Sequence, residues 1–131
     1  MNRSKPPRVI RQQLAVDMYA RCVTVLYGSI AQINDVLRVE TPDEFEMLVE
    51  SCNGHWKMYT RGGYQADYIC VRRGLDPVEE LSVIAHEALH MVSHALRTAG
   101  IEHTEATEEA YTYYLQHIVR EVLRVIRRKR A

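Results

Sequence analysis

The sequence predicts an α/β domain of the α+β type, in which a small twisted sheet packs against a histidine-bearing helix and a long C-terminal helix. Three observations predict this fold. The chain has 131 residues, of which 47% are hydrophobic and 26% charged, as in a single globular domain with one core. Its first half contains short stretches rich in aromatic and β-branched residues, which favour strands. Its second half contains two long segments with apolar residues at helical spacing.

The first half of the chain is expected to hold a strand followed by two short helices. Residues 15–27 mix aromatic and β-branched side chains, which predicts a strand with a turn or short helix before it. Ser29 is a suitable N-cap for a helix that reaches Leu37. The sequence Thr-Pro-Asp-Glu at residues 41–44 predicts the start of a further helix. That helix would run to about residue 51 and bury three apolar side chains, Phe45, Leu48 and Val49.

A hairpin and two longer helices are expected to complete the fold. Residues 55–60 and 66–72 are interpreted as two short strands, and the glycines at 62–63 supply the turn between them. Asp76, followed by proline, predicts the start of a helix over residues 77–99. A final helix would extend into the basic tail, and the candidates for its N-cap are Thr104 and Thr107.

We expect residues 1–131 to form one domain, because the chain contains no internal repeat, low-complexity tract or long linker. Residues 1–14 are expected to be flexible, and residues 124–131 are expected to form the basic end of the last helix. Basic side chains suit the C-terminus of a helix, and an acidic or nucleic-acid partner is the alternative explanation. The equal numbers of basic and acidic residues, 17 of each, give no global support for a polyanionic partner.

The cysteines and the N-terminal residues indicate where the protein is expected to reside. The three cysteines, Cys22, Cys52 and Cys70, are far apart and form no CxxC pair, which is typical of a reducing compartment. No uninterrupted apolar stretch follows the basic residues near the N-terminus. We therefore expect a cytoplasmic protein with no signal peptide, no transmembrane segment and no membrane partner.

The predicted helix over residues 77–99 contains the pattern HExxH. Four residues make slightly more than one helical turn, so His86 and His90 present their imidazoles on one face and can share a metal ion. Glu87 lies next to that face, so its carboxylate can reach a water on the metal without binding the metal itself. A chain of this composition contains HExxH by chance in roughly 2% of random orders. The pattern therefore favours a zinc site.

The two histidines also lie on the polar side of their helix. His86 and His90 share an arc with Ser93 and Arg97, which predicts that they point away from the core. Two exposed histidines without a metal would show the same pattern. The apolar arc expected to face the core consists of Val78, Leu81, Ile84, Ala85, Ala88, Leu89, Met91, Val92, Ala95 and Leu96.

A catalytic zinc ion usually takes three protein ligands, so a third ligand is expected downstream or in a loop. His94 lies about 80° around the helix from His86 and is a poor candidate. The extended metzincin pattern would need glycine and histidine at the positions where this chain has Ser93 and Leu96. The remaining candidates lie in the loop and in the last helix and are Glu102, His103, Glu105, Glu108 and Glu109.

The choice between Glu108 and Glu109 depends on the apolar stripe of the last helix. Glu108 lies on that stripe, while Glu109 lies about 100° away from it. Periodicity alone favours Glu108 as the inward carboxylate. The histidines, however, lie opposite the apolar arc of their own helix, and by the same reasoning Glu109 is the better ligand. The stripe comprises Tyr111, Leu115, Ile118, Val119, Val122 and Ile126.

The sequence HEALH, followed by EEAYTYYLQHI, resembles the gluzincin branch of the zincin-like metallopeptidases, most closely the small HExxH proteins of phages and prophages. The resemblance covers roughly residues 66–119 and is specific in the two helices. It implies a zinc-dependent hydrolase that cleaves a peptide or protein substrate, with a zinc-bound water and Glu87 as general base. It also implies that Glu109 joins the histidines as third ligand, with Tyr113 at the family's tyrosine and Thr112 in place of its alanine. Such a protein would be phage-encoded or act in a bacterial host cell.

The resemblance leaves three points open. In zincins the strand before the site helix is an edge strand that can hold an extended substrate, and residues 66–72 have a similar position. An ordinary core strand is the alternative. Tyr111, Tyr113 and His103 are candidates for hydrogen bonding to a developing oxyanion. A domain of 131 residues has little room for a second lobe, so the alternative function is a non-proteolytic zinc-binding phage or prophage structural or interaction protein of the same fold.

Overall fold

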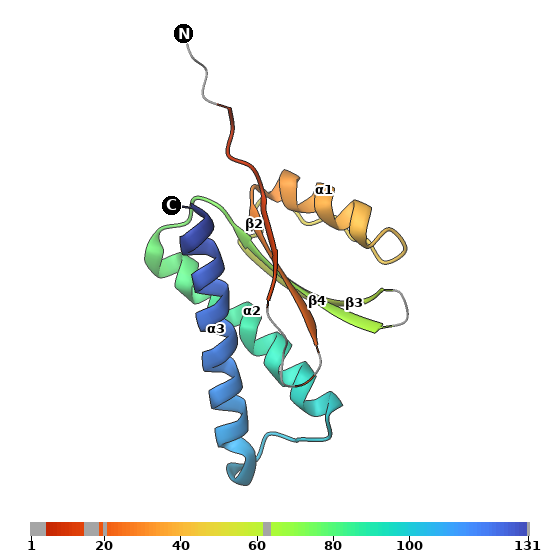
Figure 1. The fold of residues 1–131 in the computed structure, drawn as a ribbon, viewed down its shortest axis with the longest axis vertical. Helices are drawn as coiled ribbons and strands as arrows, with labels where there is room; N and C mark the ends of the chain where they lie inside the picture. Colours follow the sequence, from red (N-terminus) through yellow and green to blue (C-terminus); the bar gives the residue numbers. More distant parts are fainter. Residues whose placement is uncertain (1–4, 15–18, 20, 62–63, 131) are drawn as a thin grey trace.

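A four-stranded sheet with helices on both faces forms the framework of the molecule (Figure 1). The computed structural model describes residues 5–14, 19, 21–61 and 64–130. The strands are β1 (Ile10–Gln13), β2 (Cys22–Gly28), β3 (Gly54–Arg61) and β4 (Tyr64–Arg72). The helices are α1 (Ile30–Glu40), α2 (Pro77–Thr98) and α3 (Glu108–Arg130), and a short 3-10 turn (Glu105–Thr107) precedes α3. This combination confirms the predicted α+β fold class.

The strands are arranged in the order β1–β2–β4–β3. β2 and β4 run parallel at the centre, and β1 and β3 pair antiparallel at the two edges. Ile69 in β4 lies between Val25 of β2 and Trp56 of β3. Of the two alternatives for residues 66–72, the core strand is confirmed and the edge strand is wrong, because β4 is hydrogen-bonded on both sides. The edge strand that packs against α2 is β3.

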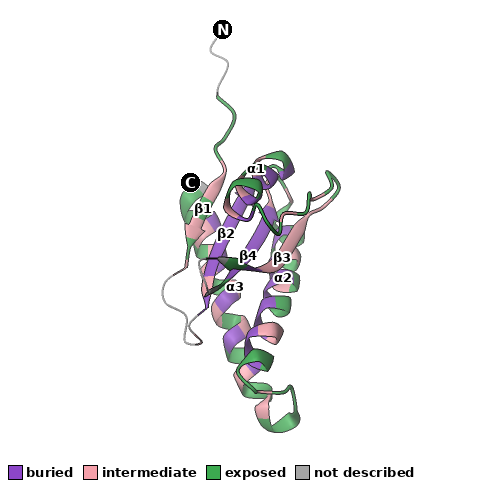
Figure 2. Cartoon of the chain, turned by 90° about the vertical axis from the view of Figure 1, so that its right-hand side faces the viewer, coloured by how far each residue is buried: buried purple, intermediate pink, exposed green. Residues whose placement is uncertain are grey.

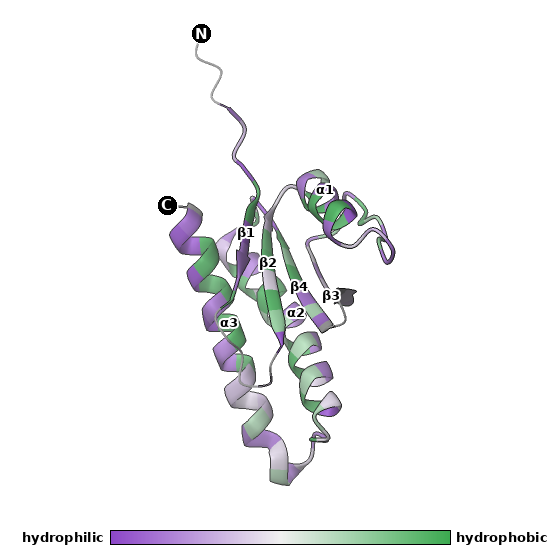
Figure 3. Cartoon of the chain, turned by 45° about the vertical axis from the view of Figure 1, so that its right-hand side comes forward, coloured by the Kyte–Doolittle hydropathy of each residue, from purple (hydrophilic) through white to green (hydrophobic). Residues whose placement is uncertain are grey.

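Each face of the sheet carries its own hydrophobic cluster. Val25 and Ile69 point to the face that α2 and α3 cover, whereas Leu26 and Tyr68 point to the face that α1 covers. Because successive strand residues point to opposite faces, the two central strands are buried almost throughout. Figure 2 shows β2 and β4 as buried, and Figure 3 shows hydrophobic residues concentrated on the same two strands. α2 thus packs on a sheet whose central strands are buried.

Local sequence explains where α1 and α2 begin, as predicted. The Ser29 hydroxyl accepts a hydrogen bond from the backbone N–H of Gln32 (3.1 Å), and the Gln32 side chain accepts one from the backbone N–H of Ser29 (3.0 Å). This reciprocal pair is a capping box. The Asp76 carboxylate accepts hydrogen bonds from the backbone N–H groups of Val78 and Glu79, at 3.0 and 2.9 Å. Both bonds satisfy donors that a helix N-terminus leaves free.

No helix forms at residues 41–51, so that prediction is wrong. Thr41 instead ends α1, because its hydroxyl and its backbone N–H both donate to the carbonyl oxygen of Leu37, at 2.6 and 2.8 Å. The Asn34 side chain then holds the backbone of Leu48 through two hydrogen bonds of 2.8 and 3.0 Å. These bonds occupy the groups that a new helix would need. Of the three residues expected to be buried, Phe45 and Leu48 are half-buried and Val49 is exposed.

The N-terminal part of the chain is more ordered than the sequence predicts. Ile10–Gln13 forms β1 on the edge of the sheet, so the expectation that residues 1–14 are flexible is wrong for these four residues. The side chain of Gln32 also donates a hydrogen bond to the carbonyl oxygen of Pro7 (2.8 Å). The strand expected within residues 15–27 begins at Cys22. Residues 15–18 and 20, and the predicted turn at 62–63, lie outside the described residues.

Candidate functional site

The HExxH residues lie near the middle of α2. The Nε2 atoms of His86 and His90 are 3.2 Å apart, and the two rings meet edge to face at a centroid distance of 4.9 Å. The side chain of His86 is 68% exposed. Two nitrogen ligands of a tetrahedral zinc ion, each about 2.05 Å from the metal, lie about 3.3 Å apart. The histidine pair therefore fits two neighbouring ligand positions of such an ion.

Glu87 has a different environment from the two histidines. Its side chain is buried, and its Oε1 atom is 3.7 Å from Nε2 of His86. Burial raises the pKa of the Glu87 carboxyl, and the neighbouring histidines oppose this shift only in part. Gly54 at the start of β3 lies directly against it, because a Cβ atom at this position would be 3.2 Å from Cγ of Glu87. The carboxylate thus lies between the helix and the edge strand, close to the histidine pair.

The outward orientation of the histidines is confirmed, whereas the predicted apolar arc is buried only in part. The sheet covers the side of α2 that carries Glu87, so the buried face is rotated toward that residue and includes Glu80. The opposite edge of the predicted arc is left at the surface. The exposed members of the arc are Val78 (76%), Leu81 (43%) and Leu89 (49%).

A buried polar network that was not predicted from the sequence lies behind the histidines. Trp56 donates a hydrogen bond from Nε1 to the Asp67 carboxylate (3.0 Å). Asp67 is fully buried and accepts two further bonds from Arg21, at 2.7 and 2.8 Å. The Trp56 ring lies nearly parallel to the His90 ring, with centroids 6.1 Å apart. A single aspartate at an inward position of the apolar strand ADYICVR was the signal in the sequence that pointed to this network.

His94 belongs to this network and not to the histidine pair. Its Nδ1 atom is 3.1 Å from Nη2 of Arg21, and a guanidinium group can only donate hydrogen bonds. Nδ1 of His94 is therefore the acceptor, which requires a neutral ring. Burial and the positive charge of Arg21 both lower the pKa of His94, in agreement with this assignment. The ring also contacts Trp56, at a centroid distance of 5.5 Å.

The proposed third ligand is not assembled with the histidines. Glu108 and Glu109 are both exposed in the first turn of α3. Within the described parts of the chain, no three His, Cys, Asp or Glu side chains are grouped closely enough to hold a metal ion. The structure thus brings His86, Glu87 and His90 together and leaves Glu109 apart from them. The other candidates, Glu102, His103 and Glu105, are also exposed.

A hollow of about 530 Å³ lies between α2 and the first turns of α3. His90 and His103 both line it. The hydroxyl of Tyr111 donates to the carbonyl oxygen of Ile101 (2.6 Å), so in this arrangement it is not free to bind an oxyanion. Tyr113 is 66% exposed, and His103 packs edge to face against Tyr111. The remaining lining residues are Leu89, Ser93, Arg97, Thr112 and Leu115.

Comparison of the chain with protein-family models, with curated proteins and with solved structures finds no match. Within the described ranges, every helix is too short or too polar to pass through a lipid bilayer. The assignment of a function therefore depends on the site residues themselves and on the sequence pattern that carries them.

Proposed function

We propose that the protein is a zinc-dependent metallopeptidase that hydrolyses peptide bonds, with His86 and His90 as zinc ligands and Glu87 as general base. One observation carries the proposal. The two Nε2 atoms lie 3.2 Å apart on the outer face of α2, next to a buried carboxylate. This separation is close to the spacing of two tetrahedral zinc ligands. It also fits a hydrogen bond between the two imidazoles, so the buried Glu87 carboxylate beside the pair is what favours a metal site.

Each residue has a separate role in the proposed reaction. Zinc, when bound, polarises the scissile carbonyl and lowers the pKa of a water molecule. Glu87 accepts the proton of the attacking water and passes it to the leaving amine. The burial that raises its pKa moves its proton affinity toward neutral pH, which suits a group that must both take and release a proton. His86 and His90, exposed beside it, hold the metal.

Glu109 is proposed as the third zinc ligand. Its carboxylate is exposed and makes no ion pair with another described residue, so binding a metal would break no ion pair. Glu108 shares these properties and is therefore the matched control. Replacing Glu109 with glutamine is expected to weaken zinc binding at least about tenfold, and Glu108→Gln to have little effect. The reverse result would assign the ligand to Glu108.

The edge strand β3 offers a place for a peptide substrate. Among the described residues, β3 pairs only with β4, so the outer backbone groups in its middle can bind a further strand. At its ends, the carbonyl oxygen of Gly54 accepts a hydrogen bond from Cys52 (3.0 Å) and the backbone N–H of Thr60 donates one to Glu44 (3.1 Å). Gly54 brings the start of β3 against Glu87, and Trp56 brings its middle against His90. An extended peptide paired with this strand would run along the histidine pair, as in other cases of strand addition.

Cleavage of a peptide library in the presence of zinc tests the proposal. Wild-type protein should produce cleavages that disappear in the Glu87→Gln variant, which still binds zinc. Glu79→Gln changes an exposed glutamate in the same helix and should leave the cleavages unchanged. Identical products from the wild type and Glu87→Gln would contradict the proposed role of Glu87.

A non-proteolytic zinc-binding protein of the same fold, serving as a phage or prophage structural or interaction component, is the second candidate. The 68% exposure of the His86 side chain favours it, because a protease cleft normally encloses its metal. This candidate predicts zinc binding without any cleavage that depends on Glu87. Under either function we place the protein in the cytoplasm, where its three free cysteines would stay reduced.

A further inference from the structure

A second hollow, of about 840 Å³, runs along the surface of α3 and shares Thr112 and Leu115 with the hollow beside His90. All nine residues that line it belong to this helix. Its floor consists of three half-buried apolar residues, Leu115, Val119 and Leu123, which are spaced one helical turn apart. From Thr112 to Arg128 the hollow extends over about 24 Å of helix. It therefore has the length of a partner helix of about four turns.

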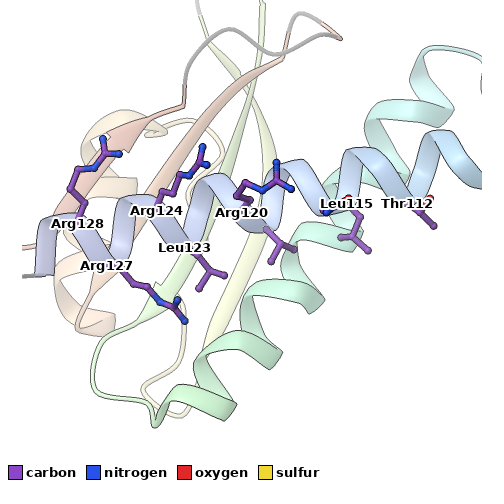
Figure 4. A pocket seen from close by; sticks show the side chains of 9 residues that line it. Thr112, Leu115, Arg120, Leu123, Arg124, Arg127 and Arg128 are labelled. Carbon is purple, nitrogen blue, oxygen red and sulfur yellow. The ribbon is translucent and has the colours of Figure 1, made fainter.

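Arginines lie along one flank of this apolar floor. Figure 4 shows Arg120, Arg124 and Arg128 on one side of α3, and Arg127 on the side of Leu123. Arg124 is bound to Glu121 at 2.9 Å. The other three arginines are exposed and make no ion pair with any described residue. A protein with equal numbers of acidic and basic residues thus concentrates unpaired positive charge along one side of an apolar strip.

The combination of an apolar strip with exposed arginines favours one class of partner over the others. Phosphate groups of a nucleic acid would pair with the arginines but would leave the apolar floor in water. A flat lipid surface would meet the exposed arginine side chains before it reached the half-buried floor beside them. A helix with an apolar stripe flanked by carboxylates satisfies both features, because its stripe covers the floor while its acidic side chains reach the guanidinium groups.

We propose that the apolar strip and the unpaired arginines of α3 form a docking surface for an acidic amphipathic helix of a partner protein. The interaction uses neither the metal nor Glu87, so the result of its test does not depend on whether the protein is a peptidase. Leu115, Val119 and Leu123 provide the apolar contact, and Arg120, Arg127 and Arg128 set the charge and orientation of the partner.

Binding of a synthetic helix tests this surface. The probe is a fluorescein-labelled peptide of about 18 residues, with leucines at helical spacing and glutamates elsewhere. The control peptide has the same composition in an order that breaks the stripe. In fluorescence anisotropy the striped peptide should bind in a saturable manner, and the control peptide at least about tenfold more weakly. Raising the salt to about 0.5 M should weaken the binding of the striped peptide, because the arginines are exposed to solvent.

Charge-reversed variants locate the surface. Arg127→Glu/Arg128→Glu should lower the affinity at least about tenfold. Lys5→Glu/Arg38→Glu makes the same change in net charge at exposed residues outside α3 and should leave the affinity within about threefold of the wild type. Glutamates near the C-terminus of a helix can weaken it, so circular dichroism must show intact helix content. If it does not, Arg127→Gln/Arg128→Gln replaces the first variant, with an expected loss of about fivefold.

Three results would overturn the proposal. The control peptide could bind as tightly as the striped peptide, which would remove the need for the apolar floor. The Lys5 and Arg38 variant could lose as much affinity as the α3 variant, which would reduce the effect to net charge. The arginines could instead bind duplex DNA or phosphatidylserine–phosphatidylcholine vesicles while the striped peptide fails to bind, which would assign the surface to a polyanion.

Discussion

Replacing Asp67 with asparagine is expected to destabilise the fold strongly. Asp67 is fully buried and accepts three hydrogen bonds, two from Arg21 and one from Trp56. Asparagine keeps the shape of the side chain, and its oxygen can still accept from Trp56. Its NH₂ group, however, would face an N–H donor of Arg21, and the guanidinium would lose the negative charge that compensates its burial.

The size of the effect follows from the burial of both partners. The side chains of Arg21 and Asp67 are 6% and 0% exposed, and loss of one partner of a buried ion pair costs about 3–5 kcal/mol. Domains of this size have a free energy of unfolding of about 5–15 kcal/mol, so Asp67→Asn would remove a large fraction of it. With a urea dependence of about 2 kcal/mol per molar, the unfolding midpoint should fall by about 2 M.

Urea unfolding followed by circular dichroism measures this change. Asp35→Asn is the matched control, because Asp35 forms an exposed ion pair with Arg38 (3.3 Å) and should alter stability by less than about 0.5 kcal/mol. The double variant Arg21→Met/Asp67→Leu removes both charges and should recover part of the lost stability, but not all of it, because the indole N–H of Trp56 loses its acceptor. A change of less than about 1 kcal/mol in Asp67→Asn, or a double variant as unstable as the single one, would refute the reasoning.

Three further predictions concern the edge strand and its neighbours. The buried hydroxyl of Tyr59 has no hydrogen-bond partner among the described residues, and burial raises the pKa of Tyr59 to about 12. Tyr59→Phe should therefore stabilise the protein by about 1 kcal/mol near neutral pH. The difference in stability between Tyr59→Phe and the wild type should grow between about pH 10 and pH 12, where only the unfolded tyrosine loses its proton. Equal stability of the two proteins in urea unfolding at every pH would contradict this prediction. Gly54→Ala would place a Cβ atom 2.3 Å from Cγ1 of Val83. Thermal unfolding should therefore show that the free energy of unfolding falls by about 1–3 kcal/mol. An unchanged stability would mean that β3 does not approach α2 this closely. The fluorescence of Trp56, the single tryptophan, should change when zinc binds next to it, and a response that persisted in His86→Ala would place the metal elsewhere.

The helix boundaries were largely predictable, because local chemistry determines them. Ser29 and Asp76 cap α1 and α2 through their own side chains, and such contacts depend only on residues nearby in the sequence. The helix predicted at residues 41–51, which does not form, had an equally good start signal. Its failure depends on Asn34, which binds the backbone of Leu48 fourteen residues away, a contact that local propensity does not contain.

The candidate site was predictable only where it lies on one helix. The spacing of His86 and His90 requires nothing beyond helical geometry, and the structure shows their Nε2 atoms 3.2 Å apart. The contacts of Trp56 and the neutral state of His94 depend instead on pairing between strands and on a buried arginine. The order of the strands could not be predicted for the same reason, because β3 is an edge strand as a result of the pairing of β4 with β2.

Zinc content is the most direct test of the histidine pair as a metal site. Purified protein, saturated with zinc and dialysed, should retain about one ion per chain by elemental analysis. His86→Ala should retain less than about a tenth of this amount, and His117→Ala, a change of a histidine on α3, should retain all of it. A wild-type protein without zinc, or a His86→Ala variant with full zinc content, would contradict the account.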